Sequence, residues 1–195
     1  MIPDLKKWKP LEVEEIQEHL GSFEAWCLCG GRSLDWLLGR ATRGHGDTDI
    51  GVFRSDLLPC LEGIGASRVF VCEPAGGLTP WDGAELPDGI HDIWITDPGG
   101  QHWILQVMVY DDIDDYVVYR RDARIRWSKS SHAITARGVR VLNPLVTMLF
   151  KMNRAELEEK DCRDIQILIE ESANKWIHDI GENSTESRFP REEIS

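Results

Sequence analysis

Two kinds of hydrophobic pattern alternate along the first half of the chain. Val13, Ile16 and Leu20 recur at helical spacing, whereas residues 25–29 form a continuous apolar run that stops at two glycines, as a buried strand does. Gly39 is placed to end a helix. Together these patterns predict helices at 11–20, 34–38 and 55–64, and strands at 25–29, at 69–72 and in the segment that ends at Phe53.

The second half of the chain predicts a hairpin followed by helices. Two apolar runs flank Asp97-Pro-Gly-Gly, which is a strong turn signal. Pro144 favours the first turn of a helix, because its missing N–H would have no partner there. We therefore expect strands at 91–96 and 102–110 and helices at about 144–153 and 159–177.

These elements predict an α/β (α+β) fold, with a mixed β-sheet flanked by helices and a helical C-terminal part. We expect a core at residues 1–130 that includes a Gly- and Pro-rich loop at 73–89. Residues 131–180 are expected to form the C-terminal helical part, packed on the core, and 181–195 a flexible polar tail.

Composition narrows the possible functions. The 195 residues include 22 Lys and Arg against 34 Asp and Glu, a formal charge of −12, which argues against a broad basic face for DNA or RNA. No run of about 18 apolar residues predicts a membrane span. The start of the chain lacks a signal-peptide core, so we expect a cytoplasmic protein. The five cysteines form no CxxC pair, so we expect reduced, buried thiols rather than zinc ligands or disulfides.

The segment 26–53 carries the clearest chemistry. Gly30 and Gly31 follow a strand and allow a turn to approach a ligand closely. Ser33 can cap the next helix, whose free N–H groups attract phosphate. The side chains of Asp47 and Asp49 share one side of an extended chain, where a cation such as Mg²⁺ with bound phosphate oxygens would relieve their repulsion. A D-x-D pair alone is more often solvated charge, but the whole set favours a metal–nucleoside triphosphate site.

This order of residues resembles the nucleotidyltransferase superfamily related to DNA polymerase beta, and within it the aminoglycoside and lincosamide nucleotidyltransferases. Their pattern is Gly-Gly-x-x-x-Asp, a helix ending in Leu-Gly, and Thr-Arg-x-His-x-Asp-x-Asp before an apolar strand. The chain matches it with Gly30-Gly31 to Asp35, Leu38-Gly39, and Thr42-Arg43-Gly44-His45-Gly46-Asp47-Thr48-Asp49. Further similar segments are Pro144 to Lys151, Lys160-Asp161 to Asp164, and Tyr119-Arg120-Arg121-Asp122.

The resemblance implies an enzyme that moves a nucleoside monophosphate, most simply AMP, from ATP or another NTP to a hydroxyl of a small acceptor. An aminoglycoside- or lincosamide-like antibiotic is the acceptor class that it suggests, and the acidic chain suits a cationic one. Asp47 and Asp49 would bind Mg²⁺ and take part in catalysis. The triphosphate would be held by the residues of the glycine turn and by nearby cations: Gly30, Gly31, Ser33, Arg43 and Lys151.

The sequence departs from the family pattern at the third carboxylate, which the family carries on a later strand. Gln106 stands in that place, and an amide cannot accept a proton at neutral pH. Asp92, or Asp111 and Asp112, could supply the missing acid, so Gln106 and Asp92 are both candidate catalytic residues. The alternative is a degenerate member of the family that binds nucleotide without catalysis, as a sensing or interaction module. Neither a nucleic acid nor a membrane is an expected partner.

Overall fold

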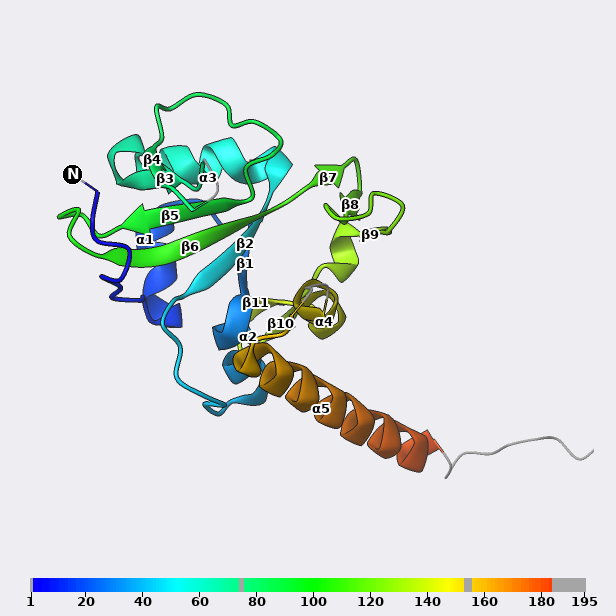
Figure 1. Ribbon diagram of the computed structural model, residues 1–195. Helices are drawn as coiled ribbons and strands as arrows, with labels where there is room; N and C mark the ends of the chain where they lie inside the picture. The colour runs from blue at the N-terminus through cyan, green and yellow to red at the C-terminus, as the bar shows by residue number, and fades with distance from the viewer. Residues whose placement is uncertain (1, 74–75, 153–155, 184–195) are drawn as a thin grey trace, which may run out of the picture. The chain divides into compact units, whose positions relative to one another are not determined.

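A mixed sheet of eight strands is the main feature of the first of two compact units, residues 1–147; the second unit is 148–195 (Figure 1). The computed structural model describes residues 2–73, 76–152 and 156–183, and these hold all the elements given below. In sheet order the strands are β10 (Ala133–Ala136), β11 (Val139–Leu142), β1 (Trp26–Cys29), β2 (Asp49–Phe53), β6 (Trp103–Tyr110), β5 (Asp92–Thr96), β3 (Val69–Val71) and β4 (Thr79–Pro80).

Two neighbouring pairs in this sheet are parallel, β1 with β11 and β2 with β6, and the other pairs are antiparallel. A smaller sheet contains β7 (Asp112–Ile113), β8 (Tyr116–Val118) and β9 (Arg126–Ser128). The α-helices are α1 (Ile16–Leu20), α2 (Gly30–Leu38), α3 (Leu57–Ile64), α4 (Pro144–Met152) and α5 (Glu159–Asn183), and 3₁₀ turns lie at Val13–Glu15, Arg54–Asp56, Ala66–Arg68 and Lys129–Ser131. The predicted α/β sheet flanked by helices is therefore confirmed.

Two local expectations were wrong. We expected a helix from Leu34 with Ser33 as its cap, but α2 begins at Gly30 and Ser33 lies inside its first turn. Within the segment expected to be helical, 133–142 forms the hairpin of β10 and β11. Arg137 and Gly138 both have positive φ, which matches the tight turn of a two-residue hairpin. The expected tail begins inside α5, and its residues 184–195 lie outside the described residues.

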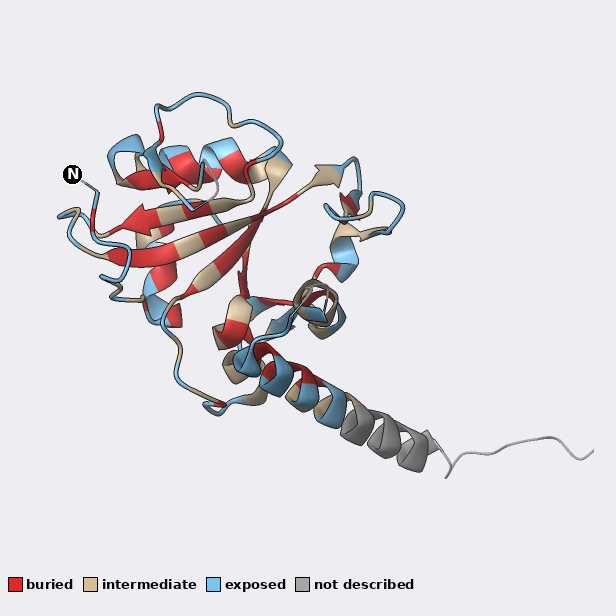
Figure 2. Ribbon diagram, in the orientation of Figure 1, coloured by how far each residue is buried: buried red, intermediate tan, exposed pale blue. Residues whose placement is uncertain are grey.

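One face of the central strands carries the main core. Alternate residues of β1, β2, β5 and β6 are fully or almost fully buried, and they pack with α1 and α3. Figure 2 shows the buried residues along these strands and their recurrence along α3. The core residues of these elements include Leu28, Ile50, Val52, Ile93, Ile95, Leu105, Val107, Val109, Ile16, Leu20, Cys60 and Leu61.

The opposite face of the same strands, called the open face below, carries small and polar side chains beside larger apolar and aromatic ones. The register places Cys29, Asp49, Gln106 and Trp94 in one row across β1, β2, β6 and β5. The next row contains Cys27, Gly51, Met108 and Asp92. Asp49, Gln106 and Asp92 are only partly buried, so this face holds the candidate chemistry.

Aromatic groups pack at two places on the open face. Trp94 makes edge-on contacts with Trp8 and Trp103, at ring-centre distances of 4.9 and 5.3 Å. His132 lies against Tyr110 and Phe53, at 4.4 and 5.0 Å. The polar residues therefore share this face with two packed aromatic clusters.

Within the part of the chain that is described, no helix is both long and apolar enough to cross a membrane.

Candidate active site

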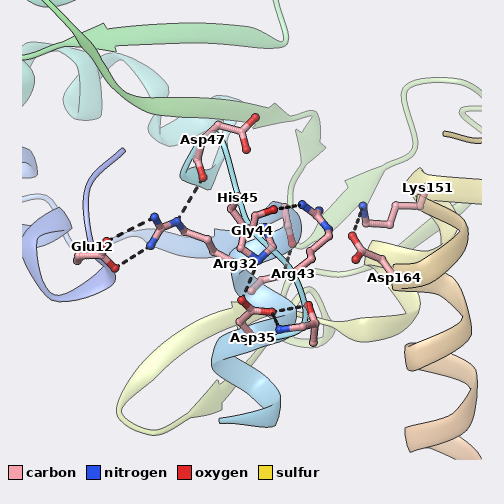
Figure 3. Close-up of polar contacts among 12 residues, drawn as sticks. Glu12, Arg32, Asp35, Arg43, Gly44, His45, Asp47, Lys151 and Asp164 are labelled. Carbon is pink, nitrogen blue, oxygen red and sulfur yellow. Dashed lines mark hydrogen bonds and ion pairs between the residues drawn. The ribbon is translucent and has the colours of Figure 1, made fainter. Parts of the chain in front are cut away.

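Asp35 on α2 anchors the loop that leads into β2. Its Oδ1 accepts hydrogen bonds from the backbone N and the hydroxyl of Thr42, at 2.9 and 2.5 Å, and its Oδ2 lies 2.8 Å from His45 Nε2 (Figure 3). Burial alone would raise the pKa of Asp35, but these hydrogen bonds outweigh it and lower the pKa. The carboxylate therefore holds both ends of the 42–45 turn on α2, so Asp35 and His45 shape the loop.

The two glycines make room for the side chains of this loop. Gly30 has φ +64°, and a Cβ there would collide with the Asp49 carboxylate. A Cβ on Gly31 would collide with the Arg43 guanidinium and with the His45 ring. Glycine is required here because a left-handed backbone and close side-chain packing coincide. The Asp49 carboxylate and the Arg43 guanidinium therefore lie directly against the start of α2.

The N-terminus of α2 offers donors to an anion. Its N-cap residue is Cys29, which supplies no side-chain cap. The Ser33 hydroxyl does not cap the helix either, because it donates to the Gly30 carbonyl at 2.7 Å. The first N–H groups of a helix point outward along its axis and favour negative charge. The turn can therefore present backbone N–H groups to a phosphate, while the Ser33 hydroxyl stabilises the turn.

Asp47 and Asp49 flank a buried residue where the loop becomes a strand. Between them, the Thr48 hydroxyl donates to the Leu11 carbonyl at 2.7 Å, and the Thr48 carbonyl accepts from the Gln106 N–H at 2.9 Å. Asp49 is the first residue of β2, and alternate residues of an extended chain share one side, which places Asp47 and Asp49 opposite to Thr48 if the extended backbone starts at Asp47. Both are partly exposed. Their carboxylates can thus act on one ligand at the edge of the open face.

Arg32 supports this edge of the site from α2. Its Nε donates to the Asp47 carbonyl at 3.3 Å, and its Nη1 forms a 2.8 Å ion pair with Glu12 (Figure 3). A hollow of about 490 Å³ lies beside this loop. Its lining is rich in arginine and includes Arg32, Arg40, Arg43 and Arg137. The same lining also includes the carboxylates of Glu12, Glu14 and Asp35, so the hollow carries both signs of charge.

Gln106 and Asp92 meet on the open face. Gln106 lies in register with Asp49 on β2, and its Nε2 donates to Asp92 Oδ1 at 2.7 Å. The Trp94 indole donates to the same oxygen at 3.1 Å, and the Cys72 thiol is close enough to act on the pKa of this carboxylate. Burial raises the pKa of Asp92 despite these donors and the nearby Arg120 charge. An acid therefore lies beside Gln106, on the neighbouring strand.

The two other acids that could replace the third carboxylate are held elsewhere. Asp111 accepts from Arg54 Nε at 2.6 Å and lies 2.7 Å from His91 Nε2. Asp112 pairs with Lys129 at 2.5 Å. Both follow the end of β6. Of the three candidates, only Asp92 contacts Gln106 through a hydrogen bond in the described structure.

Lys151 lies in the second unit, where it is paired. Its ammonium is 2.8 Å from Asp161 Oδ1 and 2.9 Å from Asp164 Oδ2 (Figure 3). Both carboxylates are buried, so the pair links α4 to the start of α5. Any phosphate that binds Lys151 would compete with these two carboxylates.

The donors at the edge of β2 fit a magnesium ion better than a metal held by protein groups alone. Among the residues described, no group of three or more His, Cys, Asp and Glu side chains could hold a metal. Mg²⁺ is commonly bound by one or two carboxylates together with substrate phosphates. Asp47 and Asp49, next to an uncapped helix start, match that set.

Besides Gln106, three residues act on Asp92 in the folded chain, and the sequence did not connect any of them with it. Trp94 could have been found, because Asp92 and Trp94 are alternate residues of a predicted strand and therefore share a face. Cys72 and Arg120 carried no such signal, since they come from other segments and approach Asp92 only in the folded chain.

Comparison with known proteins supports the fold. No protein-family model and no curated protein matches the chain. Among solved structures, the chain is similar to the lincosamide antibiotic adenylyltransferase LnuA in its lincomycin-bound form, with a TM-score of 0.53 and 16% identity over 82% of this chain and 98% of that one. It is also similar to ANT(2″)-Ia in complex with adenylyl-2″-tobramycin, with a TM-score of 0.47 and 13% identity over 78% of this chain and 82% of that one.

These identities are low, so the likeness establishes the fold and not the activity. The expected fold is confirmed, because the chain is similar in structure to LnuA, which is described as a lincosamide antibiotic adenylyltransferase. The chain has the α/β nucleotidyltransferase fold, in the form found in a lincosamide adenylyltransferase.

Proposed function

We propose that the protein transfers a nucleoside monophosphate, AMP in the simplest case, from an NTP to a hydroxyl of a small acceptor. The observation that supports this most strongly is the contact between the Asp49 side chain and the Gly30 turn. It joins an anion-binding helix start to a pair of carboxylates, which is the combination that a metal-bound triphosphate needs.

The residues of the chain would divide the work as follows. Backbone N–H groups at the start of α2 and the Arg43 guanidinium bind the phosphates, and Ser33 keeps the turn in shape. Asp47 and Asp49 would hold Mg²⁺, which neutralises charge on the transferring phosphoryl group when it is bound. Asp35 and His45 keep the loop in place, so the two carboxylates are oriented before the substrate arrives. The sequence also suggests Lys151 as a phosphate-binding residue, and its ammonium is paired with Asp161 and Asp164.

A lincosamide- or aminoglycoside-like antibiotic is the acceptor class that we propose. LnuA, which shares the fold, is described as a lincosamide antibiotic adenylyltransferase with lincomycin bound. The acidity of the chain favours a cationic acceptor, and salt should then weaken acceptor binding by screening. A cytoplasmic location remains a prediction from the sequence.

The direct test combines the protein and Mg²⁺ with each of the four NTPs and with lincomycin or an aminoglycoside. Mass spectrometry should find a nucleotidylated product, and pyrophosphate should be released in equal amount. Asp47→Asn should abolish both signals, while Asp97→Asn should keep them, because Asp97 lies in the turn after β5 and pairs with His102. If no pair of substrates reacts, or if Asp47→Asn reacts as the wild type does, enzymatic transfer is ruled out.

The second candidate function is nucleotide binding without transfer. Gln106 favours it, because an amide occupies the place beside Asp49 where the family carries a carboxylate. In that case Mg-ATP should raise the melting temperature by mass action, with no turnover for any acceptor. Binding that survives Asp47→Asn unchanged would contradict this candidate as well, since both functions use the same metal-bound triphosphate.

A further inference from the structure

Three polar residues of the open face come from three neighbouring strands, with Asp92 one row away from the row that Asp49 and Gln106 share. Asp49 is on β2, Gln106 is its register partner on β6, and Asp92 on β5 accepts a 2.7 Å hydrogen bond from Gln106. Neighbouring strands are about 4.8 Å apart. A carboxylate is therefore present at this site, but it is one strand farther from Asp49 than the Gln106 position.

The surroundings of Asp92 hold its carboxylate in one orientation. Gln106 Nε2 and the Trp94 indole both donate to Oδ1, so the plane of the group is set by two fixed donors. The Gln106 amide is in turn near Met108, whose sulfur lies 3.4 Å from its Nε2. This degree of support exceeds what a solvated surface aspartate has, and it is typical of a side chain that must face a ligand.

Charge and burial at this point suit proton transfer. Burial raises the pKa of Asp92, and the Cys72 thiol and the Arg120 guanidinium are the other polar groups that act on it. A carboxylate with a raised pKa is a better proton acceptor than an ordinary one, and Arg120 still favours its ionised form. Asp92 is only partly buried on the open face, in contrast to the core residues of the same strand.

We propose that Asp92 is the general base of the transfer and that Gln106 is the residue that positions it; this inference rests on the proposed function. The acceptor hydroxyl oxygen attacks the α-phosphorus of the NTP and forms a new P–O bond. The bond to the pyrophosphate oxygen breaks and its electron pair leaves with pyrophosphate. The hydroxyl proton passes to the Asp92 carboxylate, so atoms and charges balance.

The position of the general base determines where the acceptor hydroxyl lies. A base on β5 takes a proton from a hydroxyl above β5 and β6, whereas a base on β6 would draw the hydroxyl closer to β2. The acceptor then occupies the part of the open face next to Trp94 and Arg120. The triphosphate stays over β2 and the start of α2.

The experiment compares four proteins, the wild type, Asp92→Asn, Gln106→Leu and Asp97→Asn, with Mg-ATP and lincomycin or an aminoglycoside as substrates. Asp92→Asn should lower kcat by at least about 100-fold, the usual range for loss of a general base. Gln106→Leu should lower kcat about tenfold with an unchanged KM for ATP, because it disturbs the orientation of the base and not the nucleotide site. Calorimetry should give the same Kd for Mg-ATP, within about twofold, in all four proteins.

A chemical rescue separates the base from a structural role. Asp92→Ala should regain activity when formate is added, because a free carboxylate can accept the same proton, and Asp47→Asn should not. The proposal is overturned if Asp92→Asn keeps kcat within about threefold of the wild type while Asp47→Asn is inactive; the transfer itself would then stand. If the wild type transfers nothing with any of these probes, the proposed function fails, and the role of Asp92 fails with it.

Discussion

Leu105 and Gln106 are neighbours on β6, yet they belong to surfaces with opposite properties. Leu105 is fully buried and packs in the core with Val107. Gln106 is partly exposed, lies beside Asp49 and hydrogen-bonds Asp92. Alternation along a strand sends successive side chains to opposite faces, so one strand contributes to both surfaces.

The two faces of the sheet have different roles. The core face supplies the hydrophobic burial that stabilises the fold, and the open face carries polar groups that would be costly inside that core. Small residues on the open face leave space for larger neighbours: a Cβ on Gly51 would lie 2.7 Å from the Tyr110 ring and 3.0 Å from the Cys27 sulfur. Substitutions on the two faces should therefore change different observables.

The largest effect is expected from Asp49→Asn on the open face. Loss of one of two metal-binding carboxylates should lower the transfer rate roughly 10³-fold, which corresponds to about 4 kcal/mol. The melting temperature should stay close to that of the wild type, because Asp49 is outside the main core. A rate assay paired with a thermal unfolding curve measures both. A large fall in melting temperature with an unchanged transfer rate would contradict the expectation that the open face serves activity and the core face serves stability.

The opposite result is expected from Leu105→Ala. Removal of this fully buried side chain should cost about 3 to 4 kcal/mol of unfolding free energy, measured by urea titration. The affinity for Mg-ATP should not change while the protein is folded. Met108→Ala on the open face of the same strand is the matched control, and it should cost less because Met108 is only partly buried.

The third prediction concerns pH and His132, which packs on the open face. His132 is 1% exposed and accepts a 3.1 Å hydrogen bond from the Trp127 indole at Nδ1, and its Nε2 has no partner among the residues that the structure describes. Burial lowers its pKa from 6.5 to about 4. Between these values the unfolded chain binds a proton that the folded chain does not. The contribution of His132 to the free energy of unfolding is therefore fully present above pH 6.5. It is lost as the pH falls to 4, and the loss is at most about 3 kcal/mol.

Urea titrations at several pH values test this expectation. The free energy of unfolding of His132→Phe should fall less steeply than that of the wild type as the pH is lowered from 6.5 to 4. Comparison of the two slopes is needed because the raised pKa of Asp92 acts in the opposite direction in both proteins. Parallel curves for the wild type and the variant would show that His132 does not carry the pH dependence.

The smallest effect is expected at the loop anchor. Asp35→Asn should cost about 1 to 2 kcal/mol at pH 7, because it weakens the hydrogen bonds to Thr42 and His45. The pKa of Asp35 is lowered in the folded protein, so its stabilisation is present above the unfolded value of 3.8 and is lost as the pH falls through the lower folded value. The difference between variant and wild type should shrink below pH 4 in urea titrations. A constant difference down to pH 2 would contradict this role.

Much of the fold could be predicted from local patterns. The strands at 91–96 and 102–110 and the turn at Asp97 were found because apolar runs and turn residues are local signals, and they match β5 and β6. The start of α2 was missed by four residues, because two consecutive glycines normally indicate a turn. Here they begin a helix, and the side chains of Arg43, His45 and Asp49, which come later in the chain, pack against them.

The candidate site was only partly visible in the sequence. The Gly30 turn and the Asp-x-Asp segment could be found, since their chemistry depends on residues close together in the chain. The contact between Asp92 and Gln106 could not, because it depends on the register of β5 against β6. Likewise, nothing in the local pattern distinguished Asp92 from Asp111, which the folded chain engages with Arg54 and His91.

The sequence by itself therefore determined which residues are apolar, where strands and turns occur, and that two carboxylates follow a glycine turn. The tertiary structure decided which polar side chains meet: Asp49 with Gly30, and Gln106 with Asp92. The physical reason is that periodicity assigns a residue to a face, whereas contact between distant residues depends on strand register and on the packing that selects it.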